Sequence, residues 1–98
     1  MTYARYGTLG TTPGHRDDLV AILTRRADDM TGCLAYEVGV TDTDPDTVFV
    51  VELWESASAH AASLTLESVR AVIAEAMPLL SGEMGGQGFD VVGSPLRD

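Results

Sequence analysis

Trp54 and His60 are the residues of this chain whose types and spacing best suit a reaction site. They are the single tryptophan and one of two histidines, and they lie six residues apart in the stretch VELWESASAHAA. Histidine has an ordinary pKa near neutrality, so it can act as a general base, while an indole can form an apolar wall. A structural alternative stays open for both: Trp54 as a core residue ending an apolar strand, and His60 as a half-exposed residue on a helix face.

Two further side chains are candidates for binding a substrate. Tyr36 shares a predicted strand face with Leu34 and Val38, so core packing is the favoured interpretation, and a phenol pointing into a cavity is the alternative. Arg5 and Tyr6 stand on opposite faces of the first predicted strand, so one must face the helices and the other the opposite side. The pattern does not decide which. In a cavity, Arg5 would anchor an anionic substrate.

The hydrophobic pattern predicts the elements that position these residues. The run 48–54, VFVVELW, is apolar on both faces and is expected to pair as a hairpin with 33–40. Gly32 is expected to stop the first helix, Ser56 to cap the second, and Pro78 to kink or end the third. The glycine-rich run 81–88 is typical of a flexible connector. The predicted strands are residues 3–10, 33–40, 48–54 and 89–93, and the predicted helices are 15–30, 57–63 and a longer one from Leu66 to about Leu80.

This order, β-α-β-β-α-β, is the split pattern of a ferredoxin-like α+β domain. We expect a four-stranded antiparallel sheet with the helices on one face. A strand that is apolar on both faces does not suit a sheet with one wet face. The uncovered face is therefore expected to meet a second copy, sheet against sheet, in a two-fold homodimer with a dimeric α/β-barrel assembly.

The acidic run TDTDPDT at 41–47 offers a metal motif that fails on inspection. Asp42, Asp44 and Asp46 are spaced like the first ligands of a calcium loop. The sixth position is Thr47 rather than Gly and the twelfth is Leu53 rather than Glu, so the loop cannot close around the ion. The histidines and the cysteine also lack zinc-ligand spacing. The sequence predicts a solvated turn and no metal site.

Composition limits the class of protein. The chain has 98 residues, which we take as one domain over 1–98. Its net charge of -9 excludes a nucleic-acid binder and argues against an anionic membrane surface as a partner. No apolar run approaches the length of a membrane span, and no signal-peptide pattern is present. Cys33 is alone and cannot form an internal disulfide, so we expect a cytoplasmic protein. His15 is expected at the solvated surface.

Four stretches carry a family resemblance: TPGHRDDLVAIL, TGCLAYEV, FVVELWES and VRAVIAEAMPLLSG. In this order and at these spacings, over nearly the whole chain, they resemble the antibiotic biosynthesis monooxygenase family of small dimeric ferredoxin-like proteins, which includes quinol monooxygenases. The resemblance implies oxidation of an electron-rich phenol, anthrone or hydroquinol by O2 without flavin, haem or metal. Such an enzyme holds the substrate in a largely apolar pocket, helps to remove a proton, and excludes bulk water.

The resemblance also bears on individual residues. Trp54 matches the tryptophan that ends this strand across much of the family and lines the pocket of the quinone-forming enzymes. His60 stands where that type has a pocket tyrosine, and Val50 stands where it has an asparagine, which implies a drier pocket. The haem-degrading branch has its iron-binding histidine where this chain has Ser63 and Leu64, which argues against haem degradation.

The resulting expectation is a cofactor-independent monooxygenase acting on a small aromatic substrate and O2. Trp54 and His60 would be the catalytic pair, with Arg5, Tyr36, Val50 and Trp54 binding the substrate. Two alternatives remain: a non-catalytic ligand-binding dimer of the same fold, and a non-oxidative isomerase or cyclase that uses His60 as acid and base.

Overall fold

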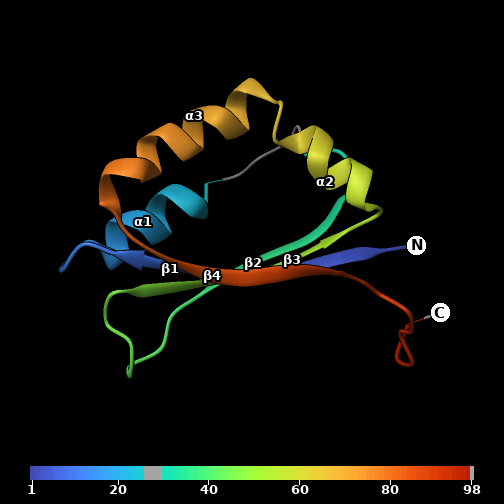
Figure 1. The fold of residues 1–98 in the computed structure, drawn as a ribbon, viewed down its shortest axis with the longest axis horizontal. Coiled ribbons are helices and arrows are strands. Elements are labelled where there is room, and N and C mark those ends of the chain that lie inside the picture. Colours follow the sequence, from blue (N-terminus) through green and yellow to red (C-terminus); the bar gives the residue numbers. More distant parts are fainter. Residues whose placement is uncertain (26–29, 98) are drawn as a thin grey trace.

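One sheet with helices on a single face makes up the fold (Figure 1). It is seen here in a computed structural model that describes residues 1–25 and 30–97. The strands are β1 (Tyr3–Thr11), β2 (Cys33–Gly39), β3 (Thr47–Trp54) and β4 (Leu80–Asp90). The helices are α1 (Arg16–Leu23), α2 (Ala57–Ser63), α3 (Glu67–Ala76) and the short 3-10 helix η1 (Met77–Leu79).

The sheet topology confirms the predicted ferredoxin-like α+β architecture. The four strands lie in the order β2-β3-β1-β4, and each neighbouring pair is antiparallel. All helices lie above one face, where α2 and α3 arch over the sheet, and both termini lie at the same end (Figure 1). The predicted hairpin between β2 and β3 is confirmed as well.

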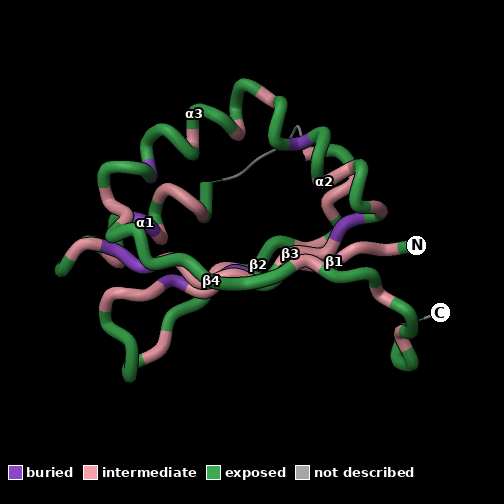
Figure 2. Tube along the Cα trace, in the orientation of Figure 1, coloured by how far each residue is buried: buried purple, intermediate pink, exposed green. Residues whose placement is uncertain are grey.

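The core forms where β3 meets the helices. Val48 and Val50 point toward the helices and join Leu19 of α1 and Ala76 of α3 in one buried cluster. On the opposite face Val51 is 54% exposed. Figure 2 shows the same division, with buried segments confined to short parts of the strands and of the helices above them. The alternation predicted for this strand is confirmed, and its second apolar face is uncovered.

The first helix is shorter than predicted. It ends at Leu23, and Met30 lies outside any helix, while residues 26–29 fall outside the described residues. The Thr24 hydroxyl donates to the Val20 carbonyl oxygen at 2.7 Å. Local side-chain hydrogen bonds of this kind compete with the backbone hydrogen bonds that would continue a helix. Gly32 is not the helix stop. It has φ +86°, and a Cβ there would lie 2.8 Å from that of Ala59 in α2, so glycine permits this close approach.

The other helices follow the prediction more closely. The predicted cap is confirmed, since Ser56 Oγ accepts a hydrogen bond from the Ala59 N–H at 3.1 Å. The third helix ends at Ala76, and Pro78 lies in η1 directly after it, as its fixed φ and missing N–H require. Of the helices in 1–25 and 30–97, none has both the length and the apolarity needed to cross a membrane.

The last strand corrects the sequence interpretation. The predicted connector 81–88 belongs to β4, which pairs with β1, while 91–93 follow the strand instead of forming it. Because glycine has a low strand propensity, the sequence pattern favours a connector at 81–88 where the structure has a strand. Here Gly86 lies opposite Gly7, and the absence of side chains allows the two backbones to approach closely. The strand is largely exposed (Figure 2).

Replacing Gly86 with alanine is expected to destabilise the fold by about 2 kcal/mol or more, because a Cβ there would meet the Tyr6 carbonyl oxygen and lie 2.6 Å from Gly7 Cα, at φ +124°. Gly39→Ala is the matched control. A Cβ at position 39 meets nothing within 4 Å, so its effect should stay below about 1 kcal/mol. Chemical denaturation followed by circular dichroism measures both, and equal effects would contradict this account of β4.

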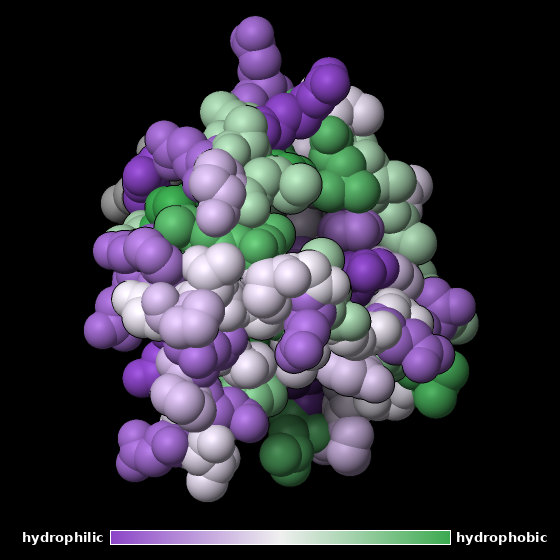
Figure 3. All heavy atoms as spheres, turned by 60° about the vertical axis from the view of Figure 1, so that its left-hand side comes forward, coloured by the Kyte–Doolittle hydropathy of each residue, from purple (hydrophilic) through white to green (hydrophobic). Residues whose placement is uncertain are grey.

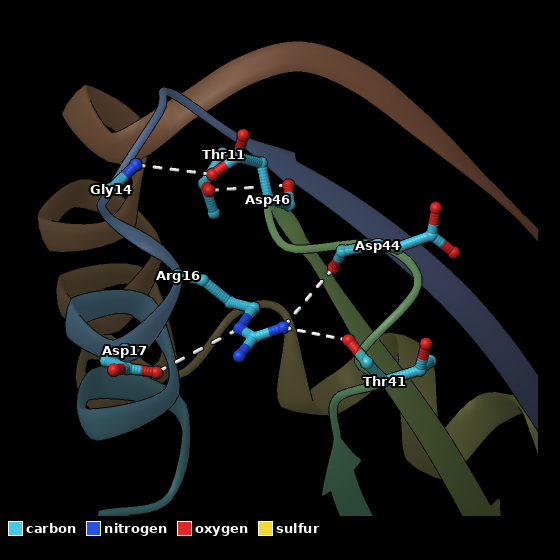
Figure 4. A network of polar contacts seen from close by, with 7 residues as sticks. All are labelled: Thr11, Gly14, Arg16, Asp17, Thr41, Asp44 and Asp46. Carbon is cyan, nitrogen blue, oxygen red and sulfur yellow. Dashed lines mark hydrogen bonds and ion pairs between the residues drawn. The ribbon is translucent and has the colours of Figure 1, made fainter.

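The acidic turn between β2 and β3 is tied to the start of α1. Arg16 Nη1 donates to the carbonyl oxygens of Thr41, at 2.9 Å, and Asp44, at 3.4 Å. The Asp46 carboxylate accepts from the Gly14 N–H at 3.2 Å (Figure 4). The expected solvated turn is therefore also a structural link, which fixes the hairpin against the first helix.

Candidate active site

A cavity of about 800 Å³ lies between the helix-facing side of the sheet and the helices. That volume falls within the ~300–1,000 Å³ of ordinary small-molecule sites. Figure 3 shows hydrophobic side chains gathered in the upper half of the molecule, at the height where Figure 1 places the helices. Both the strands and the helices contribute polar groups, among them Glu52 of β3 and His60 of α2. Lining residues that bear on the argument are Tyr36, Glu52, Trp54, His60, Val69 and Val72.

Trp54 and His60 meet on the wall of this cavity. Trp54 has no exposed surface at the end of β3, and His60 is half-buried on α2. Their ring centroids are 5.4 Å apart in an edge-on arrangement, and the centroid of the Tyr3 ring lies 5.8 Å from that of the imidazole. The strand-to-helix junction that begins at Ser56 sets this geometry. Trp54 is thus a core residue that lies directly behind the cavity wall.

Glu52 is a site residue that the sequence analysis missed. Its carboxylate accepts a hydrogen bond from Trp54 Nε1–H at 3.0 Å, and it lines the cavity. A signal was present, because Glu52 is the one carboxylate on the apolar face formed by Val48, Val50 and Trp54. Tyr3 was missed for another reason. It lies opposite Trp54, and only the pairing of β1 with β3 shows this.

Arg5, not Tyr6, faces the helices. Arg5 lies opposite Glu52 in the pairing of β1 with β3, and its Nη1 donates to the Tyr3 hydroxyl oxygen at 2.8 Å. It lines a second cavity of about 200 Å³. Tyr6 is 52% exposed and, as the register partner of Val51, belongs to the uncovered face. The structure therefore decides the orientation that the sequence left open.

Tyr36 and Val50 lie where the two cavities adjoin. Tyr36 lines both of them, so its ring is at the cavity wall and not in the core cluster that the sequence favoured. Burial, and then the nearby charge of Glu52, raises the pKa of Tyr36 to about 12, which keeps its phenol protonated and able to donate a hydrogen bond. Val50 is buried in the core and lines only the smaller cavity, where it offers an apolar surface.

Burial lowers the pKa of His60 below its ordinary value of 6.5, and the Arg5 charge lowers it further, while the Glu52 charge acts in the opposite direction. The imidazole is therefore neutral at neutral pH and can accept a proton. Because the folded pKa lies below the unfolded one, the unfolded chain takes up a proton first as the pH falls below 6.5. Folding stability is lost over that window.

We expect two substitutions to move the His60 pKa in opposite directions. Glu52→Gln removes the charge that raises it, so the pKa should fall further; Arg5→Gln removes a charge that lowers it, so the pKa should rise. A pH titration of the His60 imidazole Cε1–H signal by NMR measures this directly. The other histidine, His15, is exposed and pairs with Asp18, so His15→Gln leaves a single signal. Shifts of the same sign in both variants would contradict the arrangement.

The arrangement provides one neutral base, an indole wall and a largely apolar space. Burial and the Glu52 charge raise the pKa of the Cys33 thiol, which disfavours the reactive thiolate. Within residues 1–25 and 30–97, no group of three His, Cys, Asp or Glu side chains is placed to hold a metal ion. The site suits deprotonation of a small aromatic molecule against a largely apolar lining.

Comparisons with known proteins agree with the fold. The sequence model of the family described as antibiotic biosynthesis monooxygenase matches residues 2–75. The chain is similar to a crystal structure from Chloroflexus aurantiacus J-10-fl, a protein provisionally named antibiotic biosynthesis monooxygenase. The two are 38% identical, with 99% of this chain and 100% of that one covered and a TM-score of 0.82.

More distant structures share the fold. Rv0793 from Mycobacterium tuberculosis is 17% identical, with 97% of this chain and 99% of that one covered and a TM-score of 0.78. A Caulobacter crescentus CB15 protein with the same provisional monooxygenase name is 22% identical, with 94% and 91% covered and a TM-score of 0.77. None of the curated proteins matches the chain. The family match spans well over half of the residues, and the chain belongs to the antibiotic biosynthesis monooxygenase family.

Proposed function

We propose that this protein is a cofactor-independent monooxygenase that oxidises a small quinol or polyketide-like phenol with O2. The observation that carries the proposal is the contact between His60 and Trp54 on the wall of the large apolar-lined cavity. His60 is neutral and half-buried, which suits a general base. Family membership supports the reaction class, and the names of the related structures point the same way.

In the proposed reaction, His60 accepts a proton from the bound phenol or anthrone. The resulting carbanion donates electrons to O2, a carbon–oxygen bond forms, and the hydroperoxide loses water to leave a carbonyl group. For an anthrone, one methylene group and one molecule of O2 yield one carbonyl group and one molecule of water, with the substrate as the only reductant. Trp54 forms one wall, and the Tyr36 hydroxyl and the Arg5 guanidinium bind polar groups of the substrate. Val50 keeps its part of the site apolar.

The proposal includes a homodimer formed through the uncovered sheet face. Tyr6 and Val51 are register partners on that face, and Phe89 lies beside them through its pairing with Ala4. The exposed fractions of Tyr6, Val51 and Phe89 are 52%, 54% and 46%. Aromatic and aliphatic side chains grouped on one flat face favour association of two copies. A solution mass of twice 10.4 kDa is expected, and a mass near 10.4 kDa would contradict the dimer.

Oxygen uptake tests the proposed reaction. The chelator-treated, flavin-free protein is supplied with a panel of hydroquinols, naphthols and anthrones, and uptake is compared with a protein-free blank. Enzyme-dependent uptake with quinone formation is the expected result. Turnover that continues under argon would instead favour an isomerase or cyclase that uses His60. Saturable binding without turnover on any substrate would favour the ligand-binding dimer, an outcome with which the apolar Val50 position is also compatible.

A further inference from the structure

The smaller cavity, of about 200 Å³, lies beside the proposed reaction site on the helix-facing side of β1 and β4. Tyr36 and Glu52 line both cavities, so the two spaces adjoin at these side chains. Trp54 and His60 line only the larger one, and Arg5 only the smaller. A ligand that extends across Tyr36 and Glu52 would therefore have its two ends in chemically different surroundings.

Arg5 places a positive charge at the smaller cavity, beside the Glu52 carboxylate of the neighbouring strand. Its Nη1 donates to the Tyr3 hydroxyl oxygen, and among the described residues its guanidinium makes no ion pair. Arg25, at the edge of the larger cavity, differs in this respect because it pairs with Glu75. Since a guanidinium has five N–H donors arranged as a planar fork, Arg5 retains donors that suit a carboxylate.

A series of neighbouring side chains connects Arg5 to His60, the proposed base, and leads back to Arg5. Arg5 donates to Tyr3, the Tyr3 ring lies 5.8 Å from that of His60, and His60 lies 5.4 Å from Trp54. Trp54 donates to Glu52, which lies opposite Arg5 in the sheet. A cation and a carboxylate thus face the same space, and the carboxylate retains lone pairs that can accept from a hydroxyl group.

We propose that the smaller cavity is an anion subsite and that the substrate is a hydroxyaromatic acid. The carboxylate of the ligand binds Arg5, its ring extends past Tyr36 into the larger cavity toward Trp54, and its hydroxyl donates to Glu52 or His60. The inference rests on the proposed function for the reaction, but binding of the acid does not require turnover. A monoanion suits the site better than a polyanion, because the Glu52 carboxylate faces it and the chain carries a net charge of -9.

The test compares 2,5-dihydroxybenzoate with its neutral analogue 2,5-dihydroxybenzamide by calorimetry under argon. The intact protein should bind the acid at least about tenfold more tightly. Arg5→Gln should bring the ratio close to one, chiefly by weakening binding of the acid, and Arg5→Lys should retain part of the preference. Arg70→Gln removes the same charge from an exposed position on α3 that lines neither cavity, so it should keep the full preference.

A second variant disturbs the subsite without touching its charge. A Cβ at Gly88 would meet the Tyr3 hydroxyl and lie 2.9 Å from Arg5 Nη1, so Gly88→Ala should weaken binding of the acid more than of the amide. Circular dichroism confirms that each variant is folded. Equal affinities in the intact protein, a preference that survives Arg5→Gln, or no saturable binding of the acid would overturn the subsite. Oxygen uptake separates the two proposals. Uptake with no preference for the acid would contradict only the anion subsite. A preference for the acid with no uptake would contradict only the proposed monooxygenase activity.

Discussion

Replacing His60 with glutamine is expected to lower kcat/KM for oxygen consumption by ~10²-fold or more, the usual contribution of a positioned general base. Glutamine has similar hydrogen-bonding capacity but cannot accept a proton at neutral pH. The effect should therefore fall on the chemical step, with a smaller change in substrate affinity. In the intact protein kcat/KM should rise with pH through an ionisation below 6.5, since only the neutral imidazole would act as base and burial lowers its pKa. In the glutamine variant kcat/KM should not show this rise with pH.

The control for this substitution is His15→Gln. His15 is exposed, lies before α1, and pairs only with Asp18 among the described residues, so its loss should leave both the rate and the pH profile unchanged. Oxygen-electrode measurements over a pH series, with binding measured separately under argon, resolve the two effects. If the His60 variant keeps both the rate and the rise of kcat/KM with pH, His60 is not the base, while the other assignments in the site are unaffected.

Replacing Trp54 with alanine should destabilise the folded protein by about 3–5 kcal/mol, since the side chain is wholly buried and its removal would leave a large cavity at the end of β3. The substitution would also remove the N–H that bonds to Glu52. A loss of this size is a large fraction of the ~5–15 kcal/mol that stabilises an ordinary domain, so the variant is expected to unfold at a much lower denaturant concentration.

Trp54→Phe separates packing from hydrogen bonding. Phenylalanine keeps most of the apolar wall but cannot donate to Glu52, so about 1–2 kcal/mol should be lost, well below the cost of alanine. Denaturation followed by circular dichroism measures both variants, at one protein concentration because the proposed dimer would make stability depend on concentration. A loss below about 1 kcal/mol for Trp54→Ala would show that the cavity wall does not depend on the indole.

The features that the sequence predicted well are those determined locally. The two-faced alternation of β3, the Ser56 cap and the helix Ala57–Ser63 each depend on residues within one element. The end of the third helix follows from Pro78 in the same way. Trp54 and His60 could be singled out as a pair because a short strand-to-helix junction connects them.

The features that the sequence did not reveal depend on contacts between distant segments. β4 forms because glycines on two strands far apart in the chain allow close backbone pairing, against the low strand propensity of glycine. Tyr3 joins the site only through its register with Trp54, and Arg5 through its register with Glu52. The orientation of Arg5 could not be chosen from alternation alone, because alternation leaves both faces equivalent until the sheet is assembled.

Isotope incorporation tests whether this chain by itself catalyses the reaction of an aromatic substrate with O2. The chelator-treated, flavin-free protein is supplied with an anthrone under ¹⁸O2, and the product is analysed by mass spectrometry. The account predicts one ¹⁸O atom in the new carbonyl group, one O2 consumed for each product molecule, and a rate that falls with His60→Gln. Product formed no faster than in the protein-free blank, or a carbonyl oxygen that comes from water, would contradict it.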